Sequence, residues 1–257
     1  MEILVCVKQV PDDSVTVKLN ESGAPALEDI TQVVNAFDTY ALEMATRFKE
    51  ANEGNITVLT VADADAATPS LRSCLSVGAN HAAVLNENVD TDAAGIGALL
   101  AKCAGKISET PFDMIFCGSE STDMANGQLG IMLAQEMSIP LVTNVLGVEL
   151  QGQNLMVKQE TDDGYRMIET AMPCVLMVVK PDYEPRYPSI KSKMAARKMP
   201  IAAFTADDIA MEIPCAKVVR SGISAPAQRQ GGVKIQEKDA AVAVSRAMDM
   251  MAEQKLL

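Results

Sequence analysis

The first 140 residues of the chain alternate between two hydrophobic patterns. Short, mostly apolar stretches, which suit strands buried on both faces of a sheet, occur at residues 3–10, 56–61, 82–85 and 114–117. Between them, apolar residues recur with the spacing of one helix face, at residues 35–50, 68–78 and 92–106. Strands that alternate with helices of this length predict an α/β protein with a doubly wound, mostly parallel sheet.

Residues at the expected helix ends support this division. Asn35 is of a type that caps the start of a helix, so it is expected to cap the first one. Thr68 suits the cap of the second helix and Pro69 its first turn, and Gly78 would end it.

The pattern changes after Leu141. Four further strands, joined by short turn-like pieces, are predicted at residues 142–150, 155–160, 166–170 and 174–180. They are expected to form an antiparallel extension of the sheet. Residues 181–238 show almost no periodicity, which indicates a long C-terminal arm, and a helix is predicted over 239–255.

The last predicted helix has an apolar side that must be covered. This side consists of Ala240, Val244, Ala247, Met248 and Met251. Packing on its own domain and packing on another subunit are both compatible with the pattern.

Charge and composition exclude several classes of function. The chain has 257 residues and a formal net charge of −12 at pH 7, which repels phosphate backbones, so no nucleic acid is expected as a partner. No apolar run approaches the ~20 residues of a membrane helix, and the N-terminus lacks a basic signal region, so no membrane is expected either. The six cysteines form no C-x-x-C pair and are expected to be buried and reduced, in a cytoplasmic protein.

The polar loop after residue 117 raises the possibility of a ligand. Residues 118–126 leave a predicted strand and enter a helix expected to begin near Asn126 or Gly127, which places them at the carboxyl edge of the sheet. Unpaired N–H groups at a helix start suit a phosphate. The side chains in the loop that could hydrogen-bond a ligand are Ser119, Ser121, Thr122, Asn126 and Gln128.

Glycine spacing in this loop leaves two interpretations open. Gly118, Gly127 and Gly130 would let the backbone approach an anion closely. The spacing matches neither G-x-G-x-x-G nor the P-loop pattern, however. Phosphate binding and an ordinary turn from a strand to a helix are therefore both compatible with the sequence.

Side chains suited to catalysis are scarce. His81 is the only histidine and is expected to be a solvated turn residue. No G-x-S-x-G motif is present, and without a second histidine or clustered cysteines no metal site is predicted. We therefore predict no catalytic residue in this chain, so that any redox chemistry depends on a bound cofactor.

One segment departs from the acidic character of the chain. Residues 180–198 surround the apolar Ile190 with six cations, against only Asp182 and Glu184. A solvated surface loop and a surface that steers an acidic partner are both compatible with this pattern. The six cations are Lys180, Arg186, Lys191, Lys193, Arg197 and Lys198.

Six motifs together resemble the beta subunit of electron-transfer flavoproteins. They occur in the family's order and span nearly the whole chain, which makes the set specific although each motif is weak. The motifs are VCVKQVPD at 5–12, NAFDTYALEMA at 35–45, SLRSCLSVGAN at 70–80, the loop from Asp123 to Gly130, EPRYPSIKSKMAARKMPI at 184–201 and QRQGGVK at 228–234.

The resemblance implies a heterodimer with a larger alpha subunit, which carries most contacts to an FAD that moves electrons between dehydrogenases. It also implies an adenine nucleotide in the α/β domain of this subunit: AMP in the simple electron carriers, or a second FAD in the bifurcating ones. By motif position, the cofactor-binding residues would be Cys6, Val7, Asn35, Asp38, Val61, Gly118, Thr122, Asp123, Met124, Ala125, Asn126, Gly127, Gln128, Leu129 and Gly130.

The segment around Ile190 matches the partner-recognition loop of the family. In relatives an apolar anchor, commonly leucine, docks there into an acyl-CoA dehydrogenase, so Ile190 is the expected partner-docking residue. The resemblance thus divides the chain into a nucleotide-binding domain, residues 1–180, and a second part, residues 181–257. The second part would hold the recognition loop, the extended arm and the C-terminal helix.

Two departures from the family pattern concern the nucleotide site. Met124, Ala125 and Asn126 stand where relatives usually continue with an acidic pair. Ala62 and Asp63 replace a Gly-Pro pair, which places a carboxylate near the expected phosphate end.

The start of the chain, VCVKQVPD, is more similar to the bifurcating branch, which favours FAD over AMP. With FAD here, the complex would take hydride from NADH and send one electron to a low-potential acceptor and one to an acyl-CoA dehydrogenase. With AMP, this chain would be the structural and docking half of a one-FAD shuttle. A free-standing sensor of adenine nucleotides is the alternative, and a nucleotide-hydrolysing enzyme is disfavoured by the missing P-loop.

Overall fold

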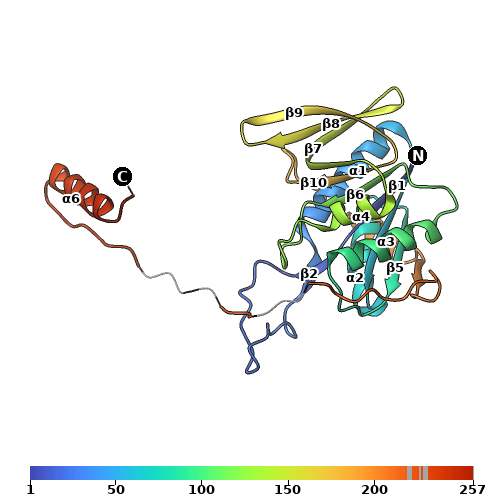
Figure 1. Ribbon diagram of the computed structural model, residues 1–257, viewed down its shortest axis with the longest axis horizontal. Helices are drawn as coiled ribbons and strands as arrows, with labels where there is room; N and C mark the ends of the chain where they lie inside the picture. Colours follow the sequence, from blue (N-terminus) through green and yellow to red (C-terminus); the bar gives the residue numbers. More distant parts are fainter. Residues whose placement is uncertain (219–221, 226, 228–230, 257) are drawn as a thin grey trace. The chain divides into compact units, whose positions relative to one another are not determined.

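The computed structural model describes residues 1–218, 222–225, 227 and 231–256 (Figure 1). The chain forms two compact units. The first comprises Met1–Val17 and Pro25–Ser221, and the second comprises Lys18–Ala24 and Gly222–Leu257. Of the QRQGGVK motif, residues 228–230 lie outside the described residues.

A nine-stranded sheet, counted over the described residues, forms the centre of the first unit (Figure 1). Its strand order is β11-β5-β4-β1-β6-β10-β7-β8-β9, and all neighbours from β11 to β7 are parallel. The parallel strands are β11 (Ile201–Phe204), β5 (His81–Asn86), β4 (Asn55–Ala62), β1 (Glu2–Cys6), β6 (Met114–Gly118), β10 (Cys174–Val178) and β7 (Leu141–Gln151). The antiparallel strands are β8 (Asn154–Thr161) and β9 (Gly164–Ala171).

Helices cover the sheet on two faces. On one face, α1 (Ala36–Asn52) and α2 (Ala64–Val77) share a buried cluster with Ile3 and Val5 of β1. On the other, α3 (Ala93–Ile107) and α4 (Leu129–Met137) share a second cluster with Leu4 and Cys6. Because successive strand side chains point to opposite faces, β1 contributes to both cores. The doubly wound α/β fold predicted from the sequence is confirmed.

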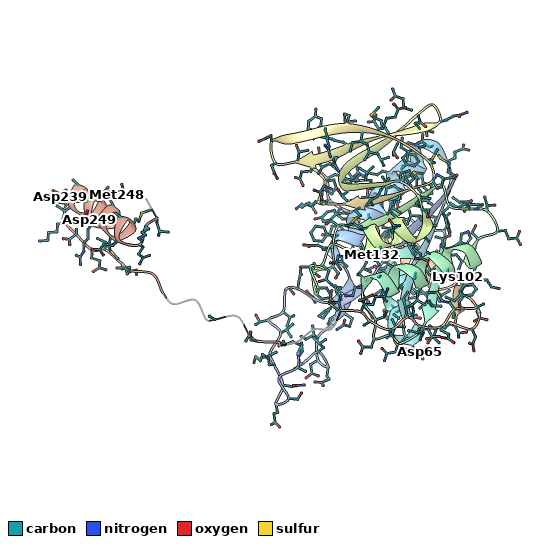
Figure 2. All side chains as sticks on the ribbon, in the orientation of Figure 1. Asp65, Lys102, Met132, Asp239, Met248 and Asp249 are labelled. Atoms are coloured by element: carbon teal, nitrogen blue, oxygen red, sulfur yellow. The ribbon has the colours of Figure 1, made fainter. Side chains whose placement is uncertain are left out.

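Smaller elements complete the two units. β2 (Gln9–Pro11) and β3 (Gln32–Val34) pair antiparallel outside the main sheet. The short helix α5 (Ile190–Ala196) packs against α2. In the second unit, α6 (Ala240–Glu253) has no buried side chain, and Met248 on its apolar side is 49% exposed (Figure 2). Packing of that side on its own domain and packing on another subunit both stay open as predictions.

Two predicted strands are wrong in their extent or their place. The strand expected over 3–10 ends at Cys6, and the chain then leaves the main sheet to form β2. The strand expected over 174–180 is not part of the antiparallel extension, because β10 lies between β6 and β7 and is parallel to both. All five of its residues are buried, as expected for an interior parallel strand.

Two predicted helix starts are also wrong. α2 begins at Ala64 rather than at Thr68, because the Asp63 carboxylate accepts a hydrogen bond from the Ala66 N–H at 2.9 Å and caps the helix there. α4 begins at Leu129 rather than at 126 or 127. Gly127 has a φ of +59°, a left-handed conformation that a right-handed helix does not contain.

The stretch 181–238 is more structured than its lack of periodicity suggested. It contains α5 and β11, and β11 adds to the sheet beside β5. His81 is exposed as expected, but it is the first residue of β5 rather than part of a turn.

The expectation of buried cysteines is correct for five of the six. Burial raises the pKa of Cys103 to about 11 and that of Cys174 to about 12, so these thiols stay protonated at neutral pH. Cys215 is exposed. Across the described residues, no helix has the length and apolar character needed to cross a bilayer.

Candidate functional site

The direction of chain progression reverses between β1 and β6. From β1 the chain passes to β4 and then β5 on one side, whereas β6 lies on the other side and is followed outward by β10. In open parallel sheets such a switch point leaves a crevice outside the carboxyl ends of the two strands, and ligands bind there. Cys6, Val7 and Lys8 leave β1 at this edge, and the loop from Gly118 leaves β6 beside them.

Two buried polar side chains of the α1 start connect these strand ends. Asp38 is 6% exposed, and its carboxylate accepts the N–H of Lys8 at 2.8 Å and that of Gly118 at 2.9 Å. Asn35 is 1% exposed; its side chain donates to the Glu120 carbonyl at 2.8 Å and accepts the Thr122 N–H at 3.0 Å. Both side chains thereby fix the backbone of the crevice.

Both helices that begin at this crevice lack side-chain caps. Asn35 is the N-cap residue of α1 but makes no cap bond, because its side chain is bonded to the 120–122 backbone; the predicted capping bond is therefore not formed. Gln128 makes no cap bond to α4 either. In contrast, Asp63 caps α2 and Asp92 caps α3. The N–H groups of α1 and α4 are thus left to a ligand or to water.

Close packing requires two of the three loop glycines, Gly118 and Gly130. A Cβ on Gly118 would lie 2.6 Å from both Asp38 Oδ1 and Phe37 Cβ. A Cβ on Gly130 would lie 2.5 Å from Cγ of Met177 and 2.8 Å from Sγ of Cys117. Gly118 lets α1 approach the end of β6, and Gly130 lets the first turn of α4 lie directly on the sheet.

A lysine at the crevice was not among the predicted site residues. The Lys8 ammonium lies 2.7 Å from the Asp123 carboxylate, and these side chains are 40% and 25% exposed. The pair connects the segment after β1 to the loop after β6. The signal that could have identified Lys8 was its position directly after a buried strand end in VCVKQVPD.

The remaining residues predicted to bind the cofactor differ in how they could reach a ligand. The Cys6 thiol and Val7 are buried, so only their backbone could face a ligand. Burial, and next the negative charge of Asp38, raise the pKa of Cys6. Val61 lies near the end of β4, and residues 123–126 are exposed on the loop. Asp63 is occupied as the cap of α2.

Asp38 carries a shifted pKa. Burial raises the pKa of its carboxyl to about 7, although the N–H donors of Lys8 and Gly118, the Asn35 side chain and the charge of Lys8 all act in the opposite direction. The folded protein therefore holds this proton between about pH 4 and 7, where an unfolded aspartate, with a pKa of about 3.9, has lost it.

We expect Asp38 to lower the stability of the fold as the pH rises. Its contribution to the free energy of unfolding is largest below about pH 4, decreases until about pH 7 and is constant above that. Since one pKa unit corresponds to about 1.4 kcal/mol, the decrease amounts to a few kcal/mol. Asp38→Asn keeps an acceptor but does not ionise, so urea unfolding of the variant should show a flatter pH dependence than the wild type. An unchanged slope would contradict this role.

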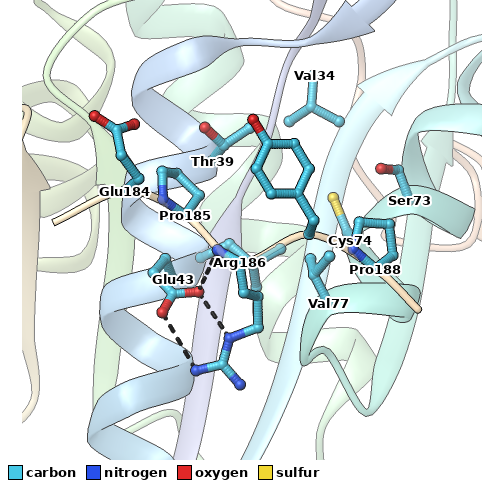
Figure 3. Close-up of a pocket in the computed structure, with 12 residues that line it drawn as sticks. Val34, Thr39, Glu43, Ser73, Cys74, Val77, Glu184, Pro185, Arg186 and Pro188 are labelled. Atoms are coloured by element: carbon cyan, nitrogen blue, oxygen red, sulfur yellow. Dashed lines mark hydrogen bonds and ion pairs between the residues drawn. The ribbon is translucent and has the colours of Figure 1, made fainter. Parts of the chain in front are cut away.

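Two pockets occur away from the crevice. One of about 290 Å³ lies between α1, α2 and residues 184–188 (Figure 3). Another of about 420 Å³ lies between α1 and the strands β7 to β9. No residue predicted for nucleotide binding lines either pocket. The backbone at the strand ends and helix starts therefore forms the crevice, which is not one of these pockets.

The sheet, its switch point and the two uncapped helices define an α/β protein of the class that receives ligands at the carboxyl edge of a parallel sheet. Residues 26–209 match the family model described as "Electron transfer flavoprotein domain". The chain therefore belongs to the electron transfer flavoprotein family, among its beta subunits, which confirms the resemblance drawn from the sequence motifs.

Individual relatives agree with this placement. The chain is 32% identical to the electron transfer flavoprotein subunit beta of Megasphaera elsdenii, with both chains covered in full. It is 37% identical to the subunit of the same name from Thermoanaerobacterium thermosaccharolyticum, over 82% of this chain and 81% of the relative. It is 32% identical to the Caffeyl-CoA reductase-Etf complex subunit CarD of Acetobacterium woodii, over 82% of this chain and 80% of the relative.

Proposed function

We propose that this chain is the nucleotide-binding and partner-docking subunit of a heterodimeric electron carrier, and that its crevice binds the phosphate end of an adenine nucleotide. The observation that carries this proposal is the pair of uncapped helix N-termini, α1 and α4, on the two sides of the switch point. Their free N–H groups and the positive ends of their dipoles suit an anion.

The residues at the crevice fit such a group. The backbone after Asn126 would supply N–H donors, and Lys8 would supply a positive charge on exchanging its bond to Asp123 for a phosphate oxygen. Asn35 and Asp38 would hold the surrounding backbone without contacting the nucleotide. A flavin bound to the heterodimer supplies the electron-carrying chemistry.

The proposed partners are an alpha subunit and a flavoenzyme of the acyl-CoA dehydrogenase type. The name of the Acetobacterium woodii relative places that protein in a complex with a caffeyl-CoA reductase, and we propose the same kind of partner for the present chain. Ile190, 81% exposed at the start of α5, is the proposed contact. Among the nucleotides, we favour FAD, because VCVKQVPD is more similar to the bifurcating branch than to the one-FAD shuttles.

The cofactor content of the purified heterodimer tests this proposal. Flavin is counted by absorbance after denaturation, and AMP by chromatography of the released nucleotides. Two FAD per heterodimer would support a nucleotide site for FAD here and electron bifurcation, whereas one FAD with one AMP would support the one-FAD shuttle. One FAD without a second nucleotide would contradict the proposed crevice, and a colourless monomer that binds ATP would indicate a nucleotide sensor instead.

A further inference from the structure

The docking helix α5 is too small to hold its own position. It has seven residues, and Ala196 is its one buried side chain. A helix this short is not stable in water by itself. Ile190 and Met194, one turn apart, are 81% and 59% exposed, so they do not hold it to the body of the protein.

The segment that leads into α5 is also poorly packed. Residues 184–188 line the pocket between this segment, α1 and α2 (Figure 3). Tyr187 is 94% exposed. Only part of the segment packs on the body of the protein, since Pro185 and Pro188 are half-buried while Glu184 and Tyr187 are exposed. Polar contacts before and after α5 therefore help to fix its position.

The first polar anchor is Arg186. Its Nε donates to Glu43 of α1 at 2.8 Å and its backbone N–H donates to the same oxygen at 3.2 Å (Figure 3). Glu43 is 3% exposed and also accepts Arg47 Nε at 2.7 Å. Burial alone would raise the pKa of Glu43, but the bonds from Arg186 and Arg47 outweigh it and lower the pKa. The Glu43 carboxylate that holds Arg186 therefore stays ionised at neutral pH.

The second polar anchor is Arg72 of α2. Its Nη1 donates to the Ala196 carbonyl at 2.6 Å and also to the Met199 carbonyl. Carbonyls at the end of a helix have no intrahelical donor, and a positive charge there is favourable to the helix dipole. The chain after α5 also bonds the last carbonyls of the helix, with the Met199 N–H donating to the Ala196 carbonyl at 3.3 Å. Arg72 adds a charged donor from another helix to this end of α5.

We propose that Arg72 and Arg186 are positioning residues for partner docking: they fix α5 so that Ile190 and Met194 are presented on its outer side before the partner binds. This inference rests on the proposed function, since it assumes that the partner binds at Ile190. An apolar anchor presented on a preformed helix avoids the ordering cost that a flexible segment carries on binding. Loss of either anchor should therefore weaken binding of the partner and leave the limiting rate of electron transfer unchanged.

The test uses the purified heterodimer, reduced with dithionite and mixed in a stopped-flow instrument with increasing concentrations of a short-chain acyl-CoA dehydrogenase. For Arg72→Met we expect the half-saturating dehydrogenase concentration to rise about tenfold, with an unchanged limiting rate and unchanged flavin content. Arg72→Lys retains a donor that can reach one carbonyl and should restore part of the loss. Arg166→Met is the matched control, because Arg166 bonds Gln159 on the β8–β9 hairpin and should have no effect.

Arg186 provides the second, independent variant. Replacing Arg186 alone leaves the buried Glu43 charge short of a partner, so the double variant Glu43→Gln with Arg186→Gln is used to keep the protein folded. The same rise in half-saturating concentration is expected.

The outcomes separate this inference from the proposed function. If Ile190→Asp impairs transfer but the Arg72 and Arg186 variants behave as the wild type, the positioning role is overturned and the docking surface stands. If Ile190→Asp has no effect, the docking surface and the inference both fail. A loss of flavin or of limiting rate in Arg72→Met would show a merely structural role and would also overturn the inference.

Discussion

Replacing Gly118 by alanine should abolish nucleotide binding and lower the free energy of unfolding by about 2–3 kcal/mol, the upper range for an overpacked core position. The new Cβ would lie 2.6 Å from Asp38 Oδ1 and 2.8 Å from the carbonyl carbon of Phe37. The Phe37 contact is with backbone, so the strain is relieved only by moving α1 away from β6. That movement breaks the bond from the Gly118 N–H to Asp38 and opens the crevice.

Gly105→Ala is the matched control for this prediction. Gly105 is exposed on α3, and a Cβ there meets nothing within 4 Å. Alanine favours a helix over glycine, so this change should stabilise the protein by about 0.5–1 kcal/mol. Urea unfolding and the nucleotide content of the purified complex measure both variants. Full nucleotide content in Gly118→Ala would show that the crevice does not bind the ligand.

If Ile190 is the docking anchor as proposed, replacing it by aspartate should reduce electron transfer to an acyl-CoA dehydrogenase-type partner about thirtyfold or more at concentrations below saturation. An anchor at the centre of an interface contributes about 2 kcal/mol or more, and a buried carboxylate adds a desolvation penalty. Ile190 is 81% exposed and touches neither the core nor the crevice residues, so flavin content and stability should not change.

Two further variants control the Ile190 experiment. Ile190→Leu keeps an apolar anchor of similar volume and should retain most of the transfer rate. Ile213→Asp places the same charge on an isoleucine that is 39% exposed and lies outside α5, so it should have no effect. If Ile190→Asp loses flavin instead, this segment supports the cofactor and not the partner.

The parallel core could be predicted because its signal is local. β1, β4, β5 and β6 are short apolar runs, and the helices between them show one apolar face, so each element was visible in a few residues. The place of β10 could not be predicted in the same way. Its sequence shows only that it is buried, and its insertion between β6 and β7 depends on pairing with residues about 30 to 60 positions earlier.

The candidate site shows the same limit. The sequence motifs named Asn35 and Asp38, but not what these side chains do, because Asp38 bonds backbone groups 30 and 80 residues away. α5 was missed because seven residues show no clear period, and its Arg72 contact spans 124 residues. The finer details of the site therefore follow from long-range contacts that no local pattern encodes.

The distribution of cysteines makes the protein easy to label at one position. All six lie within the described residues, and of these Cys215 alone is exposed. Maleimide reagents react with accessible thiolates, whereas burial raises the pKa of the Cys74 thiol to about 12 and shields it from reagent. A single fluorophore could thus be attached at Cys215 without engineering the chain, to follow the binding of any partner that lies close to it.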